Sequence, residues 1–162
     1  MIFVTVGSQK FQFNRLLKEI DKLIEEKVID EEVIAQIGVS DYVPQRYEHY
    51  DFLTREQFTE YMKKCDLVIT HAGTGAIITA LKNDKKVIAI PRLEKYEEHV
   101  DDHQIQLINE FKELNFIEPV YEVEKLQEAI KNVKNKKYNK YISNTKNILN
   151  DIVEYIENGE KK

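Results

Sequence analysis

The sequence contains one cysteine, Cys65, and no long hydrophobic run. A single thiol cannot form an internal disulfide, and Cys65 lies beside an apolar strand, so we expect a buried, unreactive side chain. No apolar segment approaches the roughly 20 residues that a membrane-spanning helix requires. The chain starts directly in a strand-like segment, residues 2–6, with no basic leader and no cleavage site. These absences indicate a cytoplasmic protein that does not cross a membrane.

The chain also lacks an excess of positive charge. Its 24 Lys and Arg residues are outnumbered by 29 Asp and Glu residues, which gives a formal net charge of −5. A general nucleic-acid binder obtains most of its affinity from a basic surface, so we expect no nucleic-acid partner. The exception is residues 131–146, which carry six lysines and no acid. A solvated helix face is the ordinary interpretation of this segment, and attraction to an anionic membrane surface is the alternative.

Several motifs of nucleotide-binding and hydrolytic enzymes are missing. The sequence has neither a P-loop, G-x-x-x-x-G-K-[ST], nor a kinase motif, so phosphoryl transfer from ATP has no support. Ser8 follows a glycine but lacks the G-x-S-x-G elbow of serine hydrolases. In residues 73–78, Ile78 occupies the place of the third glycine of G-x-G-x-x-G, which argues against a nicotinamide dinucleotide.

Apolar segments of two kinds alternate along the chain. Short continuous runs, typical of parallel strands covered on both faces, predict strands at residues 2–6, 33–37, 50–53, 67–69, 87–90 and 116–117. Helical periodicity predicts helices near residues 16–24, 54–65, 75–86, 100–114 and 126–133, and a longer C-terminal helix with Ile148, Leu149, Ile152, Val153 and Ile156 on one face. The alternation predicts an α/β fold: a single Rossmann-like domain over residues 1–162 with a mostly parallel sheet and C-terminal helices from about residue 124.

The most informative segment is residues 67–91, where a strand runs into a glycine-bearing turn, a helix and a second strand. Gly73 and Gly75 lie where the strand meets the helix, and a missing Cβ there lets backbone N–H groups approach a ligand beside the positive end of the helix. Residues 7–9 end the first strand with a similar turn. Ligands of such sheets bind beyond the carboxyl ends of the strands, so these turns predict a phosphate site. A tight connection that binds nothing is the alternative.

A second polar cluster, residues 98–104, follows the strand that ends at Pro91. Its imidazoles, carboxylates and amide offer donors and acceptors to a polyhydroxy ligand. His99 and His103 are four residues apart, but they lack the Glu of H-E-x-x-H and an obvious third ligand, so we expect no metal. The structural alternative is a polar first turn of a helix, in which Asp101 and Asp102 favour the helix dipole.

Three elements together resemble one family. They are Val-Thr-Val-Gly-Ser-Gln at residues 4–9 followed by a helix, His-Ala-Gly-Thr-Gly at residues 71–75, and Asp-His-Gln at residues 102–104 after a strand ending in proline. Over about residues 1–118 the chain resembles the C-terminal domain of family 28 glycosyltransferases. More narrowly, it is similar to the soluble subunit of two-component bacterial exopolysaccharide and capsule transferases (the PssE-like group) and to the corresponding subunit of the eukaryotic dolichol-pathway N-acetylglucosaminyltransferase.

The resemblance implies the C-terminal, donor-binding half of a GT-B glycosyltransferase. Such an enzyme would transfer, with inversion, a hexose or N-acetylhexosamine from a UDP-sugar to a lipid-linked saccharide acceptor in surface polysaccharide biosynthesis, without a cofactor. A membrane-anchored partner subunit would bind the acceptor and hold the chain at the cytoplasmic face of the membrane. Galactose, glucose and N-acetylglucosamine all remain open as the donor sugar. A non-catalytic subunit that binds a nucleotide sugar is the alternative.

The resemblance also divides the candidate residues by the part of the donor they would contact. The diphosphate would lie against Gly7, Ser8, Gln9, His71, Gly73, Thr74 and Gly75. The sugar would lie against Asp102, His103 and Gln104, and the ribose against Thr79, which stands where many relatives have an acidic residue. A hydroxyl forms weaker hydrogen bonds than a carboxylate does, so we expect lower affinity for the ribose than in relatives with the acidic residue.

The proton-abstracting base is assigned from ordinary acid–base chemistry. His99 is the first candidate, because an unperturbed imidazole pKa of about 6.5 suits removal of a proton from an acceptor hydroxyl. Glu98 is the second candidate. A base supplied by the partner subunit is the alternative to both.

Overall fold

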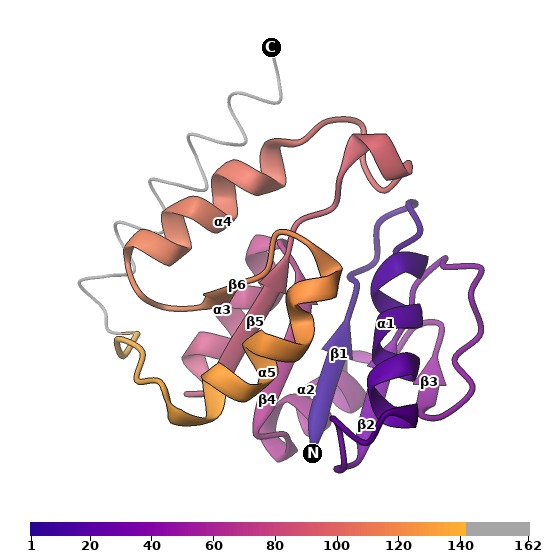
Figure 1. Cartoon of the computed structure of the whole chain (residues 1–162), viewed down its shortest axis with the longest axis horizontal. Helices are drawn as coiled ribbons and strands as arrows, with labels where there is room; N and C mark the ends of the chain where they lie inside the picture. The colour runs from indigo at the N-terminus through magenta and orange to yellow at the C-terminus, as the bar shows by residue number, and fades with distance from the viewer. Residues whose placement is uncertain (142–162) are drawn as a thin grey trace.

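A six-stranded parallel sheet forms the centre of the protein and runs in the order β3-β2-β1-β4-β5-β6 (Figure 1). The computed structural model describes residues 1–141. The strands are β1 (Ile2–Thr5), β2 (Val33–Gln36), β3 (Glu48–Tyr50), β4 (Leu67–His71), β5 (Lys86–Ile90) and β6 (Glu118–Pro119). This is the strand order of Rossmann folds, so the predicted α/β class is confirmed.

Helices cover both faces of the sheet. They are α1 (Asn14–Glu25), α2 (Arg55–Lys64), α3 (Thr74–Lys82), α4 (His103–Glu113) and α5 (Leu126–Asn135), with the short 3₁₀ turns η1 (Glu94–Tyr96) and η2 (Val123–Lys125). Helices α1 and α5 pack on the face that carries Ile2 and Val4, whereas α2, α3 and α4 pack on the face that carries Phe3. Successive side chains of a strand point to opposite faces, so two apolar faces produce the continuous apolar runs seen in the sequence. The predicted C-terminal helix with Ile148, Leu149, Ile152, Val153 and Ile156 lies outside the described residues.

The two edge strands lie away from their predicted positions. Strand β3 covers Glu48–Tyr50 rather than residues 50–53, and β6 covers Glu118–Pro119 rather than residues 116–117. Residues 51–53 instead lead into Thr54, which forms the predicted capping box at the start of α2. Every side chain of β3 and β6 is at least partly exposed, so no apolar pattern marks where these strands begin.

Helix α4 begins at His103, whereas the sequence places its start near Val100. Two short acidic side chains account for the difference. Oδ1 of Asp101 accepts the N–H of His103 at 3.1 Å, and Oδ1 of Asp102 accepts the N–H of Glu94 at 2.8 Å. Such local bonds offer the backbone an alternative to helical pairing. The interpretation of Asp101 and Asp102 as part of a first helical turn is therefore wrong.

Two further expectations concern Cys65 and membrane-spanning segments. Cys65 is buried, with 1% of its surface exposed, and burial raises the pKa of its thiol. The prediction that the thiol is buried is therefore confirmed. Within residues 1–141, no helix combines the length and the apolar character that crossing a bilayer requires.

Candidate functional site

Two turns at the carboxyl edge of the sheet enclose a pocket of about 420 Å³, a volume in the range of small-molecule sites. One turn follows β1 and the other joins β4 to α3. The pocket is lined by Thr5, Gly7, Ser8, Gln9, Gln36, Phe58, His71, Gly73, Thr74, Gly75, Ala76 and Thr79. Every residue predicted to contact the diphosphate or the ribose therefore lies in this one pocket.

The pairing of β1 with β4 brings the two turns together. Thr5 is in register with Thr70 across these parallel strands, so the residues after each strand leave the sheet side by side. The strand order reverses at this point, because the chain builds β2 and β3 on one side of β1 and later places β4 on the other. Such a switch point is where open α/β sheets bind their ligands.

The imidazole of His71 fills the space between the two turns. A Cβ added to Gly7 would lie 2.5 Å from Nε2 of His71, and a Cβ added to Gly73 would lie 2.0 Å from Cε1. Gly7 also has a φ of +76°, which disfavours other residues. Glycine is therefore required at both positions by the packing of His71. Gly75 differs, since a Cβ there would meet no atom within 4 Å.

His71 is uncharged at neutral pH. Burial, together with the positive charges of Arg92 and His99, lowers its pKa to about 3. Its Nδ1 atom is buried and has no hydrogen-bond partner among residues 1–141. A neutral imidazole still carries one N–H donor and one acceptor nitrogen, so His71 offers the pocket unused hydrogen-bonding capacity.

The start of α3 offers the pocket backbone donors. Gly73 is the N-cap residue and supplies no side-chain cap. The first N–H groups of a helix have no partner within the helix, and Thr74, Gly75 and Ala76 all line the pocket. Further along α3, the hydroxyl of Thr79 donates to the carbonyl of Gly75 at 2.8 Å, so only its acceptor lone pairs remain for a ligand.

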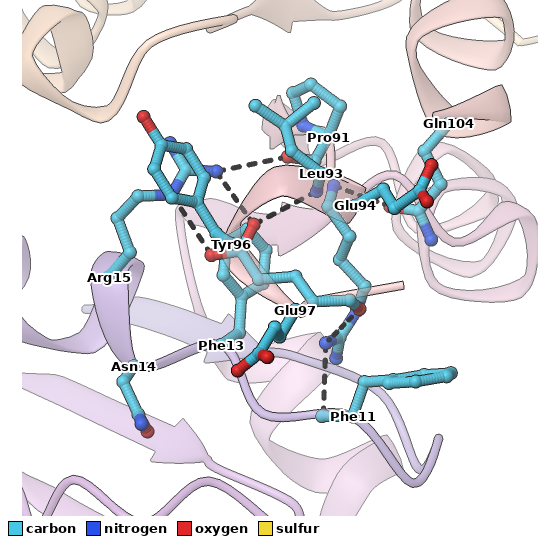
Figure 2. A network of polar contacts seen from close by, with 12 residues as sticks. Phe11, Phe13, Asn14, Arg15, Pro91, Leu93, Glu94, Tyr96, Glu97 and Gln104 are labelled. Atoms are coloured by element: carbon cyan, nitrogen blue, oxygen red, sulfur yellow. Dashed lines mark hydrogen bonds and ion pairs between the residues drawn. The ribbon is translucent and has the colours of Figure 1, made fainter. Parts of the chain in front are cut away.

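The β5–α4 connection, residues 91–102, is organised around the buried side chain of Arg92, which is 0% exposed. Its guanidinium donates to the carbonyls of Val6, Phe11 (3.1 Å) and Gln12 (3.0 Å) and lies over the Phe13 ring. Burial lowers the pKa of Arg92 to about 10 against the opposing effect of Glu98, so the side chain stays charged at neutral pH. Arg92 thus ties the turn after β1 to the connection after β5. Figure 2 shows labelled residues of both segments, among them Phe11, Phe13 and Leu93, in one network of polar contacts.

Glu98 is fully buried in the same network. Its two carboxylate oxygens accept from Nε and an Nη of Arg15, each at 3.0 Å, and one also accepts the N–H of Leu93 at 3.0 Å. The Arg15 guanidinium in turn lies 4.6 Å from the centre of the Tyr96 ring. Glu98 therefore has a structural role that the sequence did not reveal, and the geometry gives no support to its predicted role as a base.

The other residues of the second cluster also lie outside the 420 Å³ pocket. Gln104 is buried, and its Oε1 accepts the N–H of Arg92 at 2.9 Å. Asp102 accepts a hydrogen bond from the N–H of Glu94. The Nδ1 atoms of His99 and His103 both face the Asp101 carboxylate. The structure therefore assigns Gln104 and Asp102 to the support of the connection, and their contact with a sugar stays a prediction.

The comparisons with known proteins agree with this architecture. The sequence model of the "Glycosyltransferase family 28 C-terminal domain" matches residues 1–158. The chain belongs to this family. This family 28 domain is similar to the UDP-N-acetylglucosamine transferase subunit ALG13 of Candida albicans, with 31% identity over 81 residues, and of Saccharomyces cerevisiae, with 36% identity over 70 residues. The matched regions are 50% and 42% of this chain but only 26% and 31% of those proteins.

Solved structures match the family 28 domain in fold. The NMR structure of ALG13 has a TM-score of 0.57 at 21% identity, over 88% of this chain and 89% of that one. The glycotransferase of kitacinnamycin has a TM-score of 0.61 at 14% identity, over 83% of this chain and 35% of that one. The predicted correspondence to one half of a GT-B glycosyltransferase is confirmed at the level of fold.

Sequence reasoning missed the residues that hold the β5–α4 connection of the family 28 domain in place, above all Arg92 and Arg15. One signal was available. Arg92 directly follows a buried strand and Pro91, and a cation in such an apolar setting needs internal partners. Its partners are the carbonyl of Glu98 nearby and three backbone carbonyls 80 to 86 residues away, and no local pattern could identify those three.

Proposed function

We propose that this chain binds the UDP-sugar donor of a glycosyltransferase, with UDP-N-acetylglucosamine as the favoured donor. The observation that carries the proposal is the 420 Å³ pocket, in which two turns with exposed backbone surround a neutral histidine at the switch point of a family 28 domain. The choice of sugar is supported by the relatives, which are subunits of UDP-N-acetylglucosamine transferases.

The diphosphate is held by dipoles rather than by cationic side chains. The pocket lining contains neither Lys nor Arg, and His71 is uncharged. The N–H groups at the start of α3 and an N–H of His71 donate to the phosphate oxygens, and the positive end of the helix favours their charge. In an inverting transfer the same donors stabilise the departing UDP.

The nucleoside occupies the part of the pocket that faces β2 and α2. Phe58 offers an apolar surface there, and Gln36 offers an amide whose oxygen already accepts the N–H of Leu53 at 2.9 Å. An apolar wall with one well-placed polar group is typical of sites for aromatic ligands. Thr79 accepts a hydrogen bond from the ribose.

A membrane-anchored partner subunit completes the site and binds a lipid-linked saccharide acceptor. The same partner subunit holds this chain at the cytoplasmic face of the membrane. The exposed large hydrophobic side chains of residues 1–141 are Val39, Val43, Phe52, Tyr96 and Val100. All of them follow the carboxyl end of a strand: β2, β3 or β5. This distribution supports a partner that covers the carboxyl edge, positions the acceptor and excludes water.

The base belongs to the partner subunit in this proposal, because neither His99 nor Glu98 lines the pocket. The pocket lining also lacks a carboxylate, which favours a second candidate function, a subunit that binds the donor and performs no chemistry of its own. The pathway proposed for this acceptor is surface polysaccharide biosynthesis. An assay with the partner and such an acceptor separates the catalytic function from the purely binding one.

Calorimetric titration of the purified chain with UDP, UDP-N-acetylglucosamine, UDP-glucose, UDP-galactose, NAD and ATP tests the proposal. We expect binding of UDP and its sugars, with UDP-N-acetylglucosamine the tightest, and no binding of NAD or ATP. Gly75→Val should reduce UDP affinity at least about tenfold, because Gly75 lines the pocket and a Cβ at this position meets open space.

The matched control for Gly75→Val is Lys82→Val, which adds the same side chain at the exposed far end of α3. It should leave UDP affinity unchanged. Full UDP affinity in a folded Gly75→Val variant, or preference for NAD or ATP, would reject the proposed donor site.

A further inference from the structure

Three side chains that can ligate a metal ion converge in the turn before α4. Nδ1 of His99 lies 3.3 Å from Oδ1 of Asp101, and Nδ1 of His103 contacts the same carboxylate oxygen. One ligand atom from each of the three residues lies within 4.8 Å of the others. The two imidazole rings meet edge to face, with centroids 4.9 Å apart. The turn therefore supplies the third ligand that the spacing of the two histidines alone did not indicate.

The local backbone fixes this arrangement. Oδ1 of Asp101 accepts the N–H of His103, which places the carboxylate at the start of α4, next to the first helical residue. The ring of His99 packs against Phe11 with 5.6 Å between centroids, and only 8% of its side chain is exposed. Nδ1 of His99 also accepts the N–H of Asp101 at 3.4 Å. The positions of Asp101 and His99 are thus set by contacts within the turn and with Phe11.

The distances suit a small divalent ion. Zinc binds histidine nitrogen and carboxylate oxygen at about 2.0–2.2 Å, so two ligand atoms of a tetrahedral site lie about 3.3 Å apart. The His99–Asp101 separation already has this value, and the ligand atom of His103 lies within 4.8 Å of the other two. Two histidines and one carboxylate, with a position left for water, are ligands typical of Zn²⁺ and Fe²⁺.

The surrounding charge also favours a cation. The segment from Glu94 to Asp102 carries five acidic residues and one lysine, Lys95. One of the acids, Glu98, is neutralised by Arg15, which leaves an excess of negative charge around the turn. This excess opposes the positive end of α4, which by itself would repel a cation.

We propose that His99, Asp101 and His103 form a binding site for one divalent transition-metal ion, with Zn²⁺ as the favoured ion. The bound ion lies between Nδ1 of His99, Oδ1 of Asp101 and Nδ1 of His103 and joins the turn before α4 into one rigid unit beside Phe11. The site lies outside the donor pocket and does not depend on the proposed donor.

Titration of the EDTA-treated, dialysed full chain with Zn²⁺ and, separately, with Co²⁺ tests the site. We expect one equivalent of Zn²⁺ to bind with a Kd on the order of micromolar or tighter, and Co²⁺ to give the visible absorption of a site with nitrogen and oxygen ligands. His103→Ala and Asp101→Asn should each weaken Zn²⁺ binding at least about tenfold. Circular dichroism of each variant establishes that it is folded.

His49→Ala is the matched control, because it removes the partly exposed histidine of β3, remote from the turn. It should leave Zn²⁺ affinity and the Co²⁺ spectrum unchanged. Absence of stoichiometric Zn²⁺ binding, or equal weakening by His49→Ala and His103→Ala, would overturn the proposal. The titration contains no nucleotide, and UDP binding measured in EDTA reports on the donor pocket alone, so the two proposals fail separately.

Discussion

The two connections at the carboxyl edge of the sheet, β4–α3 and β5–α4, satisfy their polar groups in opposite ways. The β4–α3 turn consists of small residues around one neutral histidine. It places the first residues of α3 beside a pocket, together with His71, whose Nδ1 has no hydrogen-bond partner among residues 1–141. The β5–α4 connection is rich in charged side chains, yet its Arg92 and Glu98, like Gln104 at the start of α4, are buried and bonded within the protein. Nε of Arg92 is the buried atom of this group that has no hydrogen-bond partner among residues 1–141. Polar residues at a ligand-binding edge can therefore serve either the ligand or the scaffold, and what decides is whether their hydrogen bonds are already made.

The largest expected effect comes from removing the charge at the centre of the β5–α4 connection. Arg92→Met leaves the carbonyls of Val6, Phe11 and Gln12 without their donor inside the protein. We expect a loss of about 3–5 kcal/mol in the free energy of unfolding, measured by urea denaturation. Arg55→Met, at an exposed position of α2, is the control and should change stability by less than about 0.5 kcal/mol. Similar small losses in both variants would remove the contrast between the two connections.

A smaller effect is expected in the β4–α3 turn, where shape rather than charge is decisive. The added Cβ of Gly73→Ala would lie 2.0 Å from the His71 ring, so we expect a loss of about 1–3 kcal/mol in unfolding free energy. Gly75→Ala is the matched control and should be almost neutral. The double variant His71→Ala/Gly73→Ala should destabilise less than the sum of its single changes. Additive losses would mean that the ring does not require glycine at this position.

The pH dependence of the unfolding free energy tests whether His71, in the β4–α3 turn, is uncharged in the folded chain. His71 has a pKa of about 3 in the folded chain and about 6.5 when unfolded, so the unfolded state takes up the proton first. Stability from this group is complete above pH 6.5 and is lost as the pH falls towards 3, by up to about 1.4 kcal/mol per pH unit. Urea denaturation between pH 7 and pH 4 should show a shallower decline for His71→Asn than for the native chain. Equal slopes would mean that His71 is charged when folded.

The smallest effect concerns the ion pair of the β5–α4 connection. Glu98→Gln keeps the shape and part of the hydrogen bonding but removes the charge opposite Arg15, whose side chain is 16% exposed. We expect a loss of about 1 kcal/mol in unfolding free energy. Glu25→Gln, in the exposed pair with Arg46, is the control and should change stability by less than about 0.5 kcal/mol. A larger loss at Glu25 would contradict the importance of burial.

The place of the β4–α3 turn in the pocket could be predicted from the sequence because it follows from local rules. Continuous apolar runs identified β1 and β4, and glycine turns at the ends of parallel strands converge at one edge. The same rules placed residues 7–9 and 71–75 in one pocket. They could not show that Gly7 fits the ring of His71, because that contact joins two segments more than 60 residues apart.

The β5–α4 connection was harder to predict because its side chains are bonded to distant partners. A sequence shows that Glu98 and Gln104 are polar. It does not show that Glu98 already accepts hydrogen bonds from Arg15, or that Gln104 already accepts one from the backbone N–H of Arg92. Likewise, the sequence places Asp101 between His99 and His103, but only the turn before α4 brings the ligand atoms of the three residues together. Hydrogen bonds formed across the fold, rather than residue type, divide supporting residues from binding ones.

The hydrogen bonds of Arg92 also affect the order in which the molecule assembles. They join carbonyls of residues 6–12 to a side chain 80 to 86 positions later, so they form only after β4, α3 and β5 have closed a large chain loop. The turn after β1 begins next to the N-terminus, but it gains its final support late in folding. During synthesis this wall of the pocket stays incomplete until the segment that contains Arg92 has left the ribosome.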